Sequence, residues 1–327
     1  MSLDHAIVAD LGATNARFAL LDASGLSKVE ILRVADYPSL ASAISAYLDL
    51  VDPDRPPRLS AIAIASPVTG DYVEMTNHAW SFSIDELRDQ LAFDRLEVIN
   101  DFTAVAMAVP DLTPKDYITI GGGQVVPNTP VGVVGPGTGL GVSGLVPGRE
   151  RWTPLAGEGG HVTMPAVTER ESKVLDRLRQ RFAHVSAERV LSGMGLVNLY
   201  ETLAAIDGAD PPSREPREVT EAALAGGDRH CVEAVSMFCA MLGTIAGNLA
   251  LTLGCHGGIY IAGGIAPKMG PMFHRSEFRE RFEAKGRFRD YLEAIPTYLI
   301  THPTPAFLGL RYVLEHPTKP TAPTLTP

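Results

Sequence analysis

The chain has 327 residues, of which 45% are hydrophobic and 20% charged, so it can build a sizeable core in one large domain or, as the length favours, in two. Its formal net charge of −10 disfavours binding to nucleic acid or to an anionic membrane through the overall field of the protein. The three cysteines lack C-x-x-C spacing and the N-terminus lacks a long apolar run, so we expect a reducing, cytoplasmic location without disulfides or a signal peptide.

The N-terminal third alternates strand and helix signals, a pattern typical of an α/β fold with a mixed sheet. The first two strands are close enough in sequence to form a hairpin. Ser83 and Glu86 have the spacing of a capping box, which marks the start of a helix. The predicted strands are 5–12, 16–22, 28–35, 58–67 and 96–100, and the predicted helices are 38–51 and 83–93.

The remainder of the chain is richer in helix signals. Residues 131–146 read as two strands joined by a glycine-rich turn, whereas 151–166 are predicted to form a loop. Thr168 and Glu171 again have capping-box spacing. The most apolar run, 240–254, is interrupted by polar residues and is short for a bilayer span, so we interpret it as a buried helix. Further predictions are helix 168–182, several helices through about residue 255, a strand within 257–266, helix 307–316 and a disordered tail, rich in Pro and Thr, at 319–327.

The stretch ADLGATNARFAL (9–20) is the first of three glycine turns. Its backbone N–H groups are suited to cradle phosphate oxygens, and Gly12 permits a ligand to approach closely. Asp10 would repel a phosphate but is suited to hold Mg²⁺, through water. The alternative interpretation is an ordinary hairpin with an Asx turn.

The other two turns are VVGPGTGLGV (133–142) and IAGGIAP (261–267). The first has neither the Lys-Ser/Thr of a Walker A loop nor a dinucleotide fingerprint in register, but its N–H donors with Thr138 make a credible phosphate clamp. The second suits close packing of a flat ring such as adenine. The alternatives are a flexible hairpin and a plain strand-to-helix turn. The turns at 9–20 and 133–142 both join two apolar strands, an echo expected of two related halves.

Asn100 and Asp101 interrupt an apolar run where a strand gives way to a helix. A charge near a core is costly unless it is paired or used. Either residue could cap the helix, and the helix N-terminus would keep Asp101 ionised. The pair is therefore either a cap or part of a site in which Asp101 accepts a proton.

Further polar groups are Glu158 and His161, in a glycine-rich loop, and the pair Glu188-Arg189. Taken singly, His161 reads as a structural hydrogen-bonding residue and Glu188-Arg189 as an exposed helix start. Together with Asn100, these carboxylates and the imidazole suit a polyol, because each hydroxyl both donates and accepts. The sequence shows no Ser/His/Asp nucleophile set and no Cys or His metal-ligand spacing.

Seven stretches, in order from about residue 5 to 315, resemble the bacterial ATP-dependent glucokinases of the Escherichia coli type, within the actin-like, hexokinase-type ATPase superfamily. They are ADLGATNARFAL, ASPVTGDYVEMTNHAWSFS, LEVINDFTAVAMAVP, VVGPGTGLGV, PLAGEGGHV, ERVLSGMGLVNLYE and IAGGIAPKM. The resemblance implies a two-domain actin-like (ribonuclease H-like) fold with a cleft. Its small α/β domain would comprise 4–110 plus 302–318, and its larger α+β domain 111–301.

The resemblance also implies phosphoryl transfer from MgATP to the 6-hydroxyl of D-glucose, with Asp101 as the catalytic base and a homodimeric enzyme. The implied sugar ligands are Asn100, Asp101, Glu158, His161 and Glu188. The implied nucleotide-binding residues are Asp10, Gly12, Ala13, Thr14 and Asn15 in one loop, Gly137, Thr138 and Gly139 in the next, and Gly263 and Gly264 against the adenosine; Asp10 would hold Mg²⁺, through water.

The chain departs from the family at Ala13, where Gly is common; a methyl group there is harmless only if φ is negative. The related ROK sugar kinases and repressors usually carry a Cys-rich zinc motif after their Glu-x-Gly-His element. This chain has no cysteine there, nor room for a helix-turn-helix domain before Asp10. The motifs leave open a kinase for mannose or fructose and, less readily, a non-catalytic sugar sensor.

Overall fold

The computed structural model describes residues 5–75 and 80–317. Its contacts divide the chain into two compact units. The terminal unit comprises the chain up to Leu112 together with the chain from Pro303, and the central unit comprises Thr113–His302. The disordered tail predicted at 319–327 lies outside the described residues.

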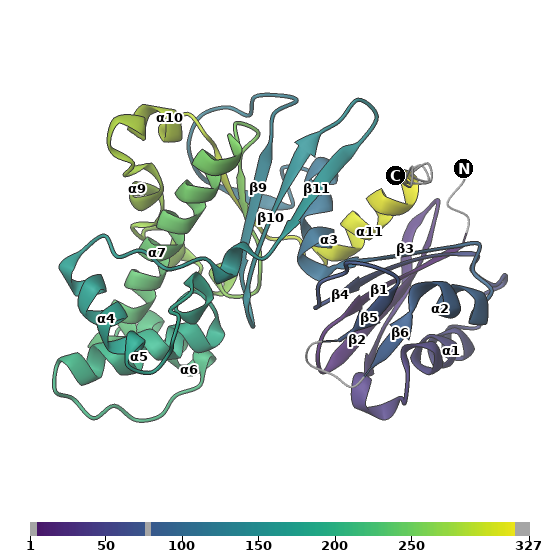
Figure 1. The fold of residues 1–327 in the computed structure, drawn as a ribbon, viewed down its shortest axis with the longest axis horizontal. Helices are drawn as coiled ribbons and strands as arrows, with labels where there is room; N and C mark the ends of the chain where they lie inside the picture. The colour runs from purple at the N-terminus through teal and green to yellow at the C-terminus, as the bar shows by residue number, and fades with distance from the viewer. Residues whose placement is uncertain (1–4, 76–79, 318–327) are drawn as a thin grey trace, which may run out of the picture. The chain divides into compact units, whose positions relative to one another are not determined.

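The terminal unit is built on a five-stranded sheet in the order β3-β2-β1-β4-β7 (Figure 1). Strands β1, β2 and β3 form an antiparallel meander, whereas β1, β4 and β7 run parallel. The predicted hairpin and mixed α/β sheet are therefore confirmed. The elements are β1 (Ala6–Leu11), β2 (Asn15–Asp22), β3 (Gly25–Arg33), η1 (Val34–Asp36), α1 (Leu40–Val51), β4 (Leu59–Ile64), β5 (Tyr72–Glu74), β6 (Ser81–Ser83), α2 (Ile84–Gln90), β7 (Arg95–Asn100), α3 (Asp101–Met107), η2 (Val109–Asp111) and α11 (Pro305–Glu315).

Helices cover both faces of this sheet, which explains why β1 is apolar almost throughout. Ile7 and Ala9 point to the face covered by α1 and α2. Ala6 and Val8, which alternate with them, point to the face covered by α3 and α11, where Phe307 packs. The terminal unit thus has three layers, and α3 is held against the sheet by α11.

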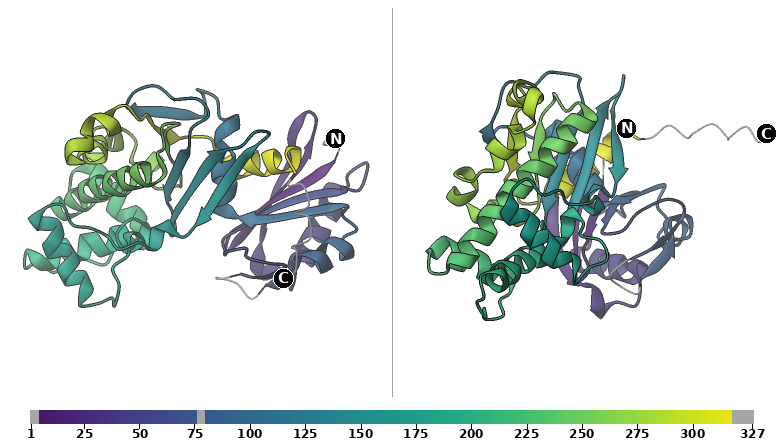
Figure 2. Two further views of the ribbon diagram at one scale, coloured as in Figure 1. Left: turned by 45° about the horizontal axis from the view of Figure 1, so that its top comes forward. Right: turned by 60° about the vertical axis from the view of Figure 1, so that its left-hand side comes forward.

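The central unit contains a six-stranded sheet in the order β11-β10-β9-β12-β13-β8, with helices packed against it (Figure 2). The elements are β8 (Tyr117–Gly121), β9 (Val131–Pro136), β10 (Leu140–Pro147), β11 (Trp152–Gly157), η3 (Gly159–His161), α4 (Glu169–Arg179), η4 (Ala187–Arg189), α5 (Gly193–Ile206), α6 (Pro216–Ala225), α7 (Arg229–Leu253), β12 (Ile259–Ile261), η5 (Ala266–Met269), α8 (Pro271–His274), α9 (Phe278–Glu283), η6 (Gly286–Phe288), α10 (Arg289–Glu293) and β13 (Thr297–Ile300).

The two sheets share one strand pattern. In the central unit β11, β10 and β9 form an antiparallel meander, and β9 then runs parallel to β12 and β12 to β13, as β1, β4 and β7 do in the terminal unit. The two echoing glycine turns therefore occupy equivalent positions, between β1 and β2 and between β9 and β10. This agrees with the interpretation of the echo as two related halves.

Helix α7 forms the centre of the apolar core in the central unit, where it packs against α5, α6 and α9 (Figure 2). With 25 residues and a mean hydropathy of 1.7 in its most apolar window, it is long and apolar enough to cross a membrane. However, 78% of that window is buried within the fold, as in the core helix of a globular protein. The prediction of a buried helix is confirmed, although the helix is longer than the apolar run indicated.

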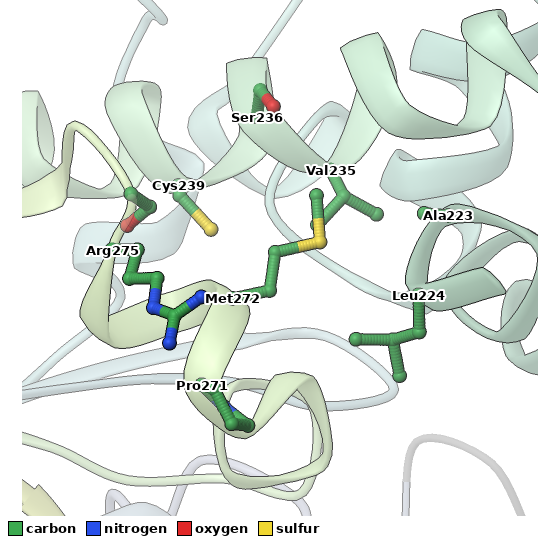
Figure 3. Close-up of a pocket in the computed structure, with 9 residues that line it drawn as sticks. Ala223, Leu224, Val235, Ser236, Cys239, Pro271, Met272 and Arg275 are labelled. Atoms are coloured by element: carbon green, nitrogen blue, oxygen red, sulfur yellow. The ribbon is translucent and has the colours of Figure 1, made fainter. Parts of the chain in front are cut away.

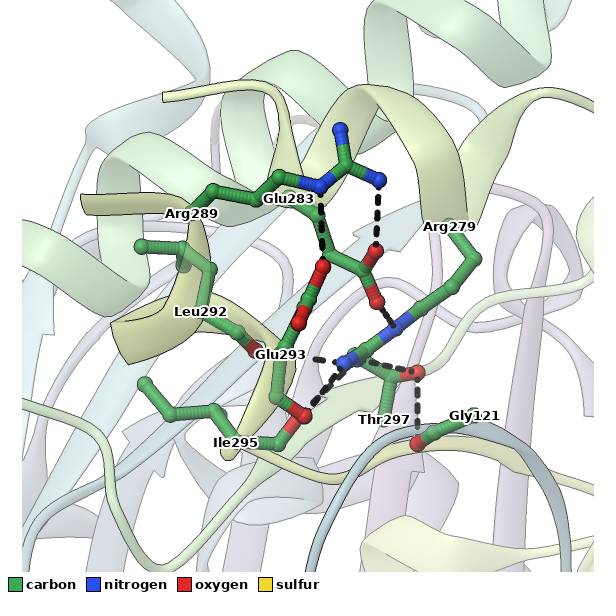
Figure 4. Close-up of polar contacts among 8 residues, drawn as sticks. All are labelled: Gly121, Arg279, Glu283, Arg289, Leu292, Glu293, Ile295 and Thr297. Atoms are coloured by element: carbon green, nitrogen blue, oxygen red, sulfur yellow. Dashed lines mark hydrogen bonds and ion pairs between the residues drawn. The ribbon is translucent and has the colours of Figure 1, made fainter. Parts of the chain in front are cut away.

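Arg279 of α9 ties the last helices of the central unit to its sheet (Figure 4). Its guanidinium donates to Glu283 Oε1 at 2.5 Å, to the Ile295 carbonyl at 2.8 Å and to Thr297 Oγ1 at 3.2 Å. Thr297 in turn donates to the Gly121 carbonyl in β8 at 3.3 Å. One side chain thus stabilises the junction between α9, α10, β13 and β8.

The structure corrects two sequence predictions. Within 151–166, predicted to be a loop, Trp152–Gly157 form β11, which pairs antiparallel with β10, and Gly159–His161 form a 3₁₀ turn. The capping box at Ser83 is only half formed: Ser83 Oγ accepts from the Glu86 N–H at 3.1 Å but donates to Asp71, at 2.6 Å. The box predicted at the start of α4 is complete.

Candidate active site

The carboxyl ends of three parallel strands bring together the predicted polar residues of the terminal unit. Leu11, Ile64 and Asn100 are in register across β1, β4 and β7, and Asp10 lies one residue earlier on β1. Ligands of open α/β sheets bind outside the carboxyl ends of such strands. The sheet topology therefore places Asp10, Asn100 and Asp101 at the edge where a ligand is expected.

Asn100 is the N-cap of α3. Its Oδ1 accepts from the N–H groups of Phe102, at 2.9 Å, and Thr103, at 3.0 Å. Its Nδ2 donates to Asp101 Oδ1 at 3.1 Å. The cap interpretation is therefore correct for Asn100, and the side-chain amide also orients the neighbouring carboxylate.

Asp101 is the first residue of α3 and is half-buried. Its Oδ1 accepts from the Phe102 N–H at 2.7 Å in addition to the Asn100 amide. The N-terminus of a helix favours a negative charge at this position. Held by two donors on short, rigid supports, the carboxylate has a defined direction from which it can accept a proton.

The turn between β1 and β2 is closed by its own backbone. The Gly12 N–H donates to the Asn15 carbonyl at 3.0 Å, so this N–H is used by the fold. Ala13, Thr14 and Asn15 are exposed. Ala13 is not among the described residues with positive φ, so its methyl group is not strained.

Asp10 lies beside Arg17 on the neighbouring strand, with 3.8 Å between Oδ2 and the guanidinium. Burial raises the pKa of Asp10 above its ordinary value, and the charge of Arg17 opposes the rise. No group of three or more His, Cys, Asp or Glu residues that could hold a metal occurs in the described part of the chain. Protein sites bind Mg²⁺ with nucleotides through only one or two carboxylates plus water and phosphate oxygens, so a single Asp10 fits this chemistry.

In the central unit, the turn between β9 and β10 is held by bonds from two directions. Within the turn, the Gly137 N–H donates to the Gly139 carbonyl at 2.8 Å. From outside, Gly193 N–H donates to the Gly137 carbonyl at 2.9 Å, and Glu188 Oε2 accepts from the Leu140 N–H at 2.9 Å. The sequence analysis identified Glu188 but missed its partner, because no local pattern relates positions 48 residues apart.

Glu158 immediately precedes the 3₁₀ turn η3, His161 is its last residue, and both residues are exposed. The glycines between them allow the turn to lie directly on β10. A Cβ on Gly160 would lie 2.0 Å from the Leu140 carbonyl oxygen, and one on Gly159 would lie 2.7 Å from the Val142 side chain. The close approach that these glycines permit is therefore to the protein's own sheet.

The third glycine turn joins β12 to η5. Gly263 has a φ of +82°, and a Cβ there would lie 2.3 Å from the Pro136 carbonyl oxygen. Around Gly264, in contrast, no heavy atom lies within 4 Å of an added Cβ. The first glycine is required by the fold, and the second faces open space.

A pocket of about 500 Å³ lies between α6, α7 and α8 in the central unit (Figure 3). Its lining contains none of the predicted site residues. Cys239 contributes a thiol, but burial raises the pKa of this thiol to about 12, so it stays protonated near neutral pH. The lining residues are Ala223, Leu224, Val235, Ser236, Cys239, Pro271, Met272, Arg275 and Ser276.

Comparison with known proteins agrees with the motif resemblance. The glucokinase family model matches residues 7–317. The chain is 53% identical over 314 residues to a glucokinase of Paramagnetospirillum magneticum (strain AMB-1), covering 95% of this chain and 98% of the relative. It is 49% identical over 318 residues to a glucokinase of Salmonella heidelberg (strain SL476), covering 95% and 98%. The crystal structure of a glucokinase from an Antarctic psychrotroph superposes with a TM-score of 0.87 and 37% identity, covering 95% of this chain and 99% of that chain. The chain belongs to the glucokinase family.

Proposed function

We propose that this ATP-dependent glucose kinase transfers the γ-phosphoryl group of ATP to the 6-hydroxyl of D-glucose, with Asp101 as the general base. The observation that carries the proposal is the fixed position of Asp101, held by the Asn100 amide and the Phe102 N–H at the N-terminus of α3. A carboxylate in that setting stays ready to accept a hydroxyl proton without moving.

Phosphoryl transfer requires alignment and charge neutralisation more than covalent work by the protein. The bond between the 6-oxygen of the sugar and the γ-phosphorus forms as the bond to the β,γ-bridging oxygen breaks, and ADP leaves with that electron pair. The proton of the 6-hydroxyl passes to Asp101. Asn100, Glu158, His161 and Glu188 are proposed to bind the remaining hydroxyl groups.

The turns between β1 and β2 and between β9 and β10 are proposed to receive the phosphates of ATP. In support, the N–H groups of Thr138 and Gly139 have no hydrogen-bond partner within the described residues. Free N–H groups in a tight turn make an anion-binding site. Asp10 is proposed to hold Mg²⁺ through water; the metal neutralises phosphate charge when it is bound. Gly264 is proposed to lie against the adenosine, beside Gly263.

Three further expectations belong to this proposal: the actin-like arrangement of two domains with a cleft, a homodimer, and a cytoplasmic location. Closure on the sugar would exclude water and limit wasteful hydrolysis of ATP. Small-angle scattering with and without glucose tests the closure, and an unchanged radius of gyration would oppose it. Light scattering coupled to size exclusion gives the oligomeric state.

The decisive experiment compares Asp101→Asn with Glu158→Ala. Asn keeps an oxygen that can accept from the Phe102 N–H, so the local structure should persist while the base is lost. We expect kcat to fall by roughly 10²–10⁴ for Asp101→Asn, with glucose affinity nearly unchanged. For Glu158→Ala we expect the KM for glucose to rise instead. Turnover at the wild-type rate in Asp101→Asn would refute the assignment.

Asp54→Asn is the matched control, because it makes the same change at an exposed carboxylate of the terminal unit and should leave both constants unchanged. A coupled ADP-release assay of the wild type that crosses glucose, mannose and fructose with ATP, ADP and polyphosphate measures the strictness of sugar and donor choice. Comparable kcat/KM for fructose or mannose would revise the proposed acceptor.

A further inference from the structure

The carboxylate of Glu188 lies against the turn between β9 and β10. Besides accepting from the Leu140 N–H, it packs so closely on Gly139 that a Cβ there would lie 2.5 Å from Oε2. The absence of a side chain at Gly139 leaves room for this carboxylate beside the turn, and the φ of Gly139 is not left-handed. Within the described residues, Leu140 is the only recorded hydrogen-bond partner of the Glu188 side chain.

The backbone that carries Glu188 is itself anchored on both sides. Before it, the Ala187 N–H donates to the Val162 carbonyl at 2.8 Å. After it, Ser192 Oγ donates to the Glu188 carbonyl at 2.9 Å and, as the N-cap of α5, accepts from the Gly195 N–H at 3.0 Å. The carboxylate is therefore presented to the turn from a fixed support.

The same support holds the turn at a second point, through the bond from the Gly193 N–H to the Gly137 carbonyl. The turn is thus fastened at Gly137 and at Leu140, one fastening on each side of Thr138 and Gly139. Those are the two residues of the turn whose N–H groups have no partner in the described part of the chain. Fastening both ends keeps these donors in place, and preorganised donors bind an anion without a cost in ordering the loop.

We propose that Glu188 is a positioning residue for the nucleotide, in addition to its proposed role as a sugar ligand. By accepting from the Leu140 N–H, it holds the turn in the form that receives phosphate. This inference rests on the proposed function of that turn. The two roles make different predictions, since a residue that only binds sugar has no effect on nucleotide affinity when sugar is absent.

The experiment measures binding of Mg²⁺ and the non-hydrolysable analogue AMPPNP by calorimetry, without glucose, to the wild type, Glu188→Ala, Glu188→Gln and Glu158→Ala. Because Glu188→Ala loses a hydrogen bond to a charged group at a half-exposed site, we expect AMPPNP affinity to fall roughly tenfold. Gln still offers an oxygen to the Leu140 N–H, so Glu188→Gln should stay within about threefold of the wild type. Glu158→Ala, which removes a proposed sugar ligand whose side chain forms no hydrogen bond to the turn within the described residues, should bind AMPPNP as the wild type does.

Hydrogen exchange at the Leu140 amide gives a second measurement that a role in sugar binding alone would not change. Exchange should be faster in Glu188→Ala than in the wild type, with no nucleotide present, and a thermal melt verifies that the variant is folded. Unchanged AMPPNP affinity in Glu188→Ala would overturn the inference, as would equal losses in Glu188→Ala and Glu188→Gln. If AMPPNP binds the wild type without protecting the amides of residues 137–140, the proposed function of the turn fails instead.

Discussion

The adjacent glycines Gly263 and Gly264 should respond in opposite ways to the same substitution by alanine. Gly263 has a left-handed φ and lies against the Pro136 carbonyl, 2.3 Å from an added Cβ. Gly264 has neither constraint. We therefore expect Gly263→Ala to destabilise the protein, and Gly264→Ala to leave the fold intact but to hinder the nucleotide.

The magnitudes follow from the two environments. For Gly263→Ala, the left-handed backbone costs ~1–2 kcal/mol and the overlap with Pro136 a further ~1–3 kcal/mol. Together these lower the free energy of unfolding by about 2–5 kcal/mol, or the melting temperature by roughly 5–15 °C for a unit of this size. Gly264→Ala should change stability by less than ~1 kcal/mol. If adenosine lies on Gly264, the added methyl group costs ~1–3 kcal/mol of binding, which raises the KM for ATP roughly five- to 150-fold.

The assay is thermal unfolding of both variants, together with the KM for ATP at saturating glucose. Gly227→Ala is the matched control, because it also lies in the central unit and no heavy atom lies within 4 Å of its added Cβ. Equal losses of melting temperature in Gly263→Ala and Gly264→Ala would refute the structural argument. An unchanged KM for ATP in a folded Gly264→Ala would refute the adenosine contact.

Three other outcomes are expected. Gly309→Ala should lower the melting temperature by several degrees and also reduce kcat, since its Cβ would lie 1.7 Å from the Ala104 carbonyl oxygen in α3, the helix that begins with the proposed base. Arg281→Ala should lower the free energy of unfolding, measured with urea, by ~3–5 kcal/mol. The substitution leaves the buried carboxylate of Glu171 without its charged partner, since Arg281 Nη1 contacts Glu171 at 2.6 Å. A hydrogen bond from an arginine lowers the pKa of Asp207 below its ordinary value of 3.8, so its stabilisation is complete above that pH and is lost as the pH falls through the lowered pKa. As the pH falls below 3.8, the melting temperature of Asp207→Asn should accordingly decrease less steeply than that of the wild type.

The sequence predicts best those features that depend on neighbouring residues. The capping box at Thr168 and Glu171 joins positions three apart, and the hairpin of β1 and β2 needs only a short turn between apolar strands. Asn100 and Asp101 belong to the same group, because a cap acts on the next three residues. These predictions succeed because the interactions are local in the chain.

Features that depend on partners distant in the chain are not predicted by local sequence patterns. β11 is an edge strand with partly exposed residues, and Pro154 and Gly157 weaken its strand signal; its pairing with β10 makes it a strand. The sequence analysis also assigned no elements to β8 or β13, which pair with each other across more than 170 residues. The bond from Leu140 to Glu188 is of the same kind: the sequence identifies the carboxylate but gives no sign of what it holds.

Glycines beside polar residues illustrate why sequence alone poorly distinguishes a glycine that the fold requires from one that belongs to a binding site. Gly159 and Gly160 stand between two proposed sugar ligands, yet β10 lies where their side chains would be, so the fold alone explains them. Gly137 is different: its φ is not left-handed, and the nearest heavy atom to an added Cβ is 4.0 Å away. Neither packing nor backbone conformation requires a glycine at that position. The proposed phosphate site would account for this glycine, because the N–H groups of Thr138 and Gly139 have no hydrogen-bond partner within the described residues and suit a phosphate.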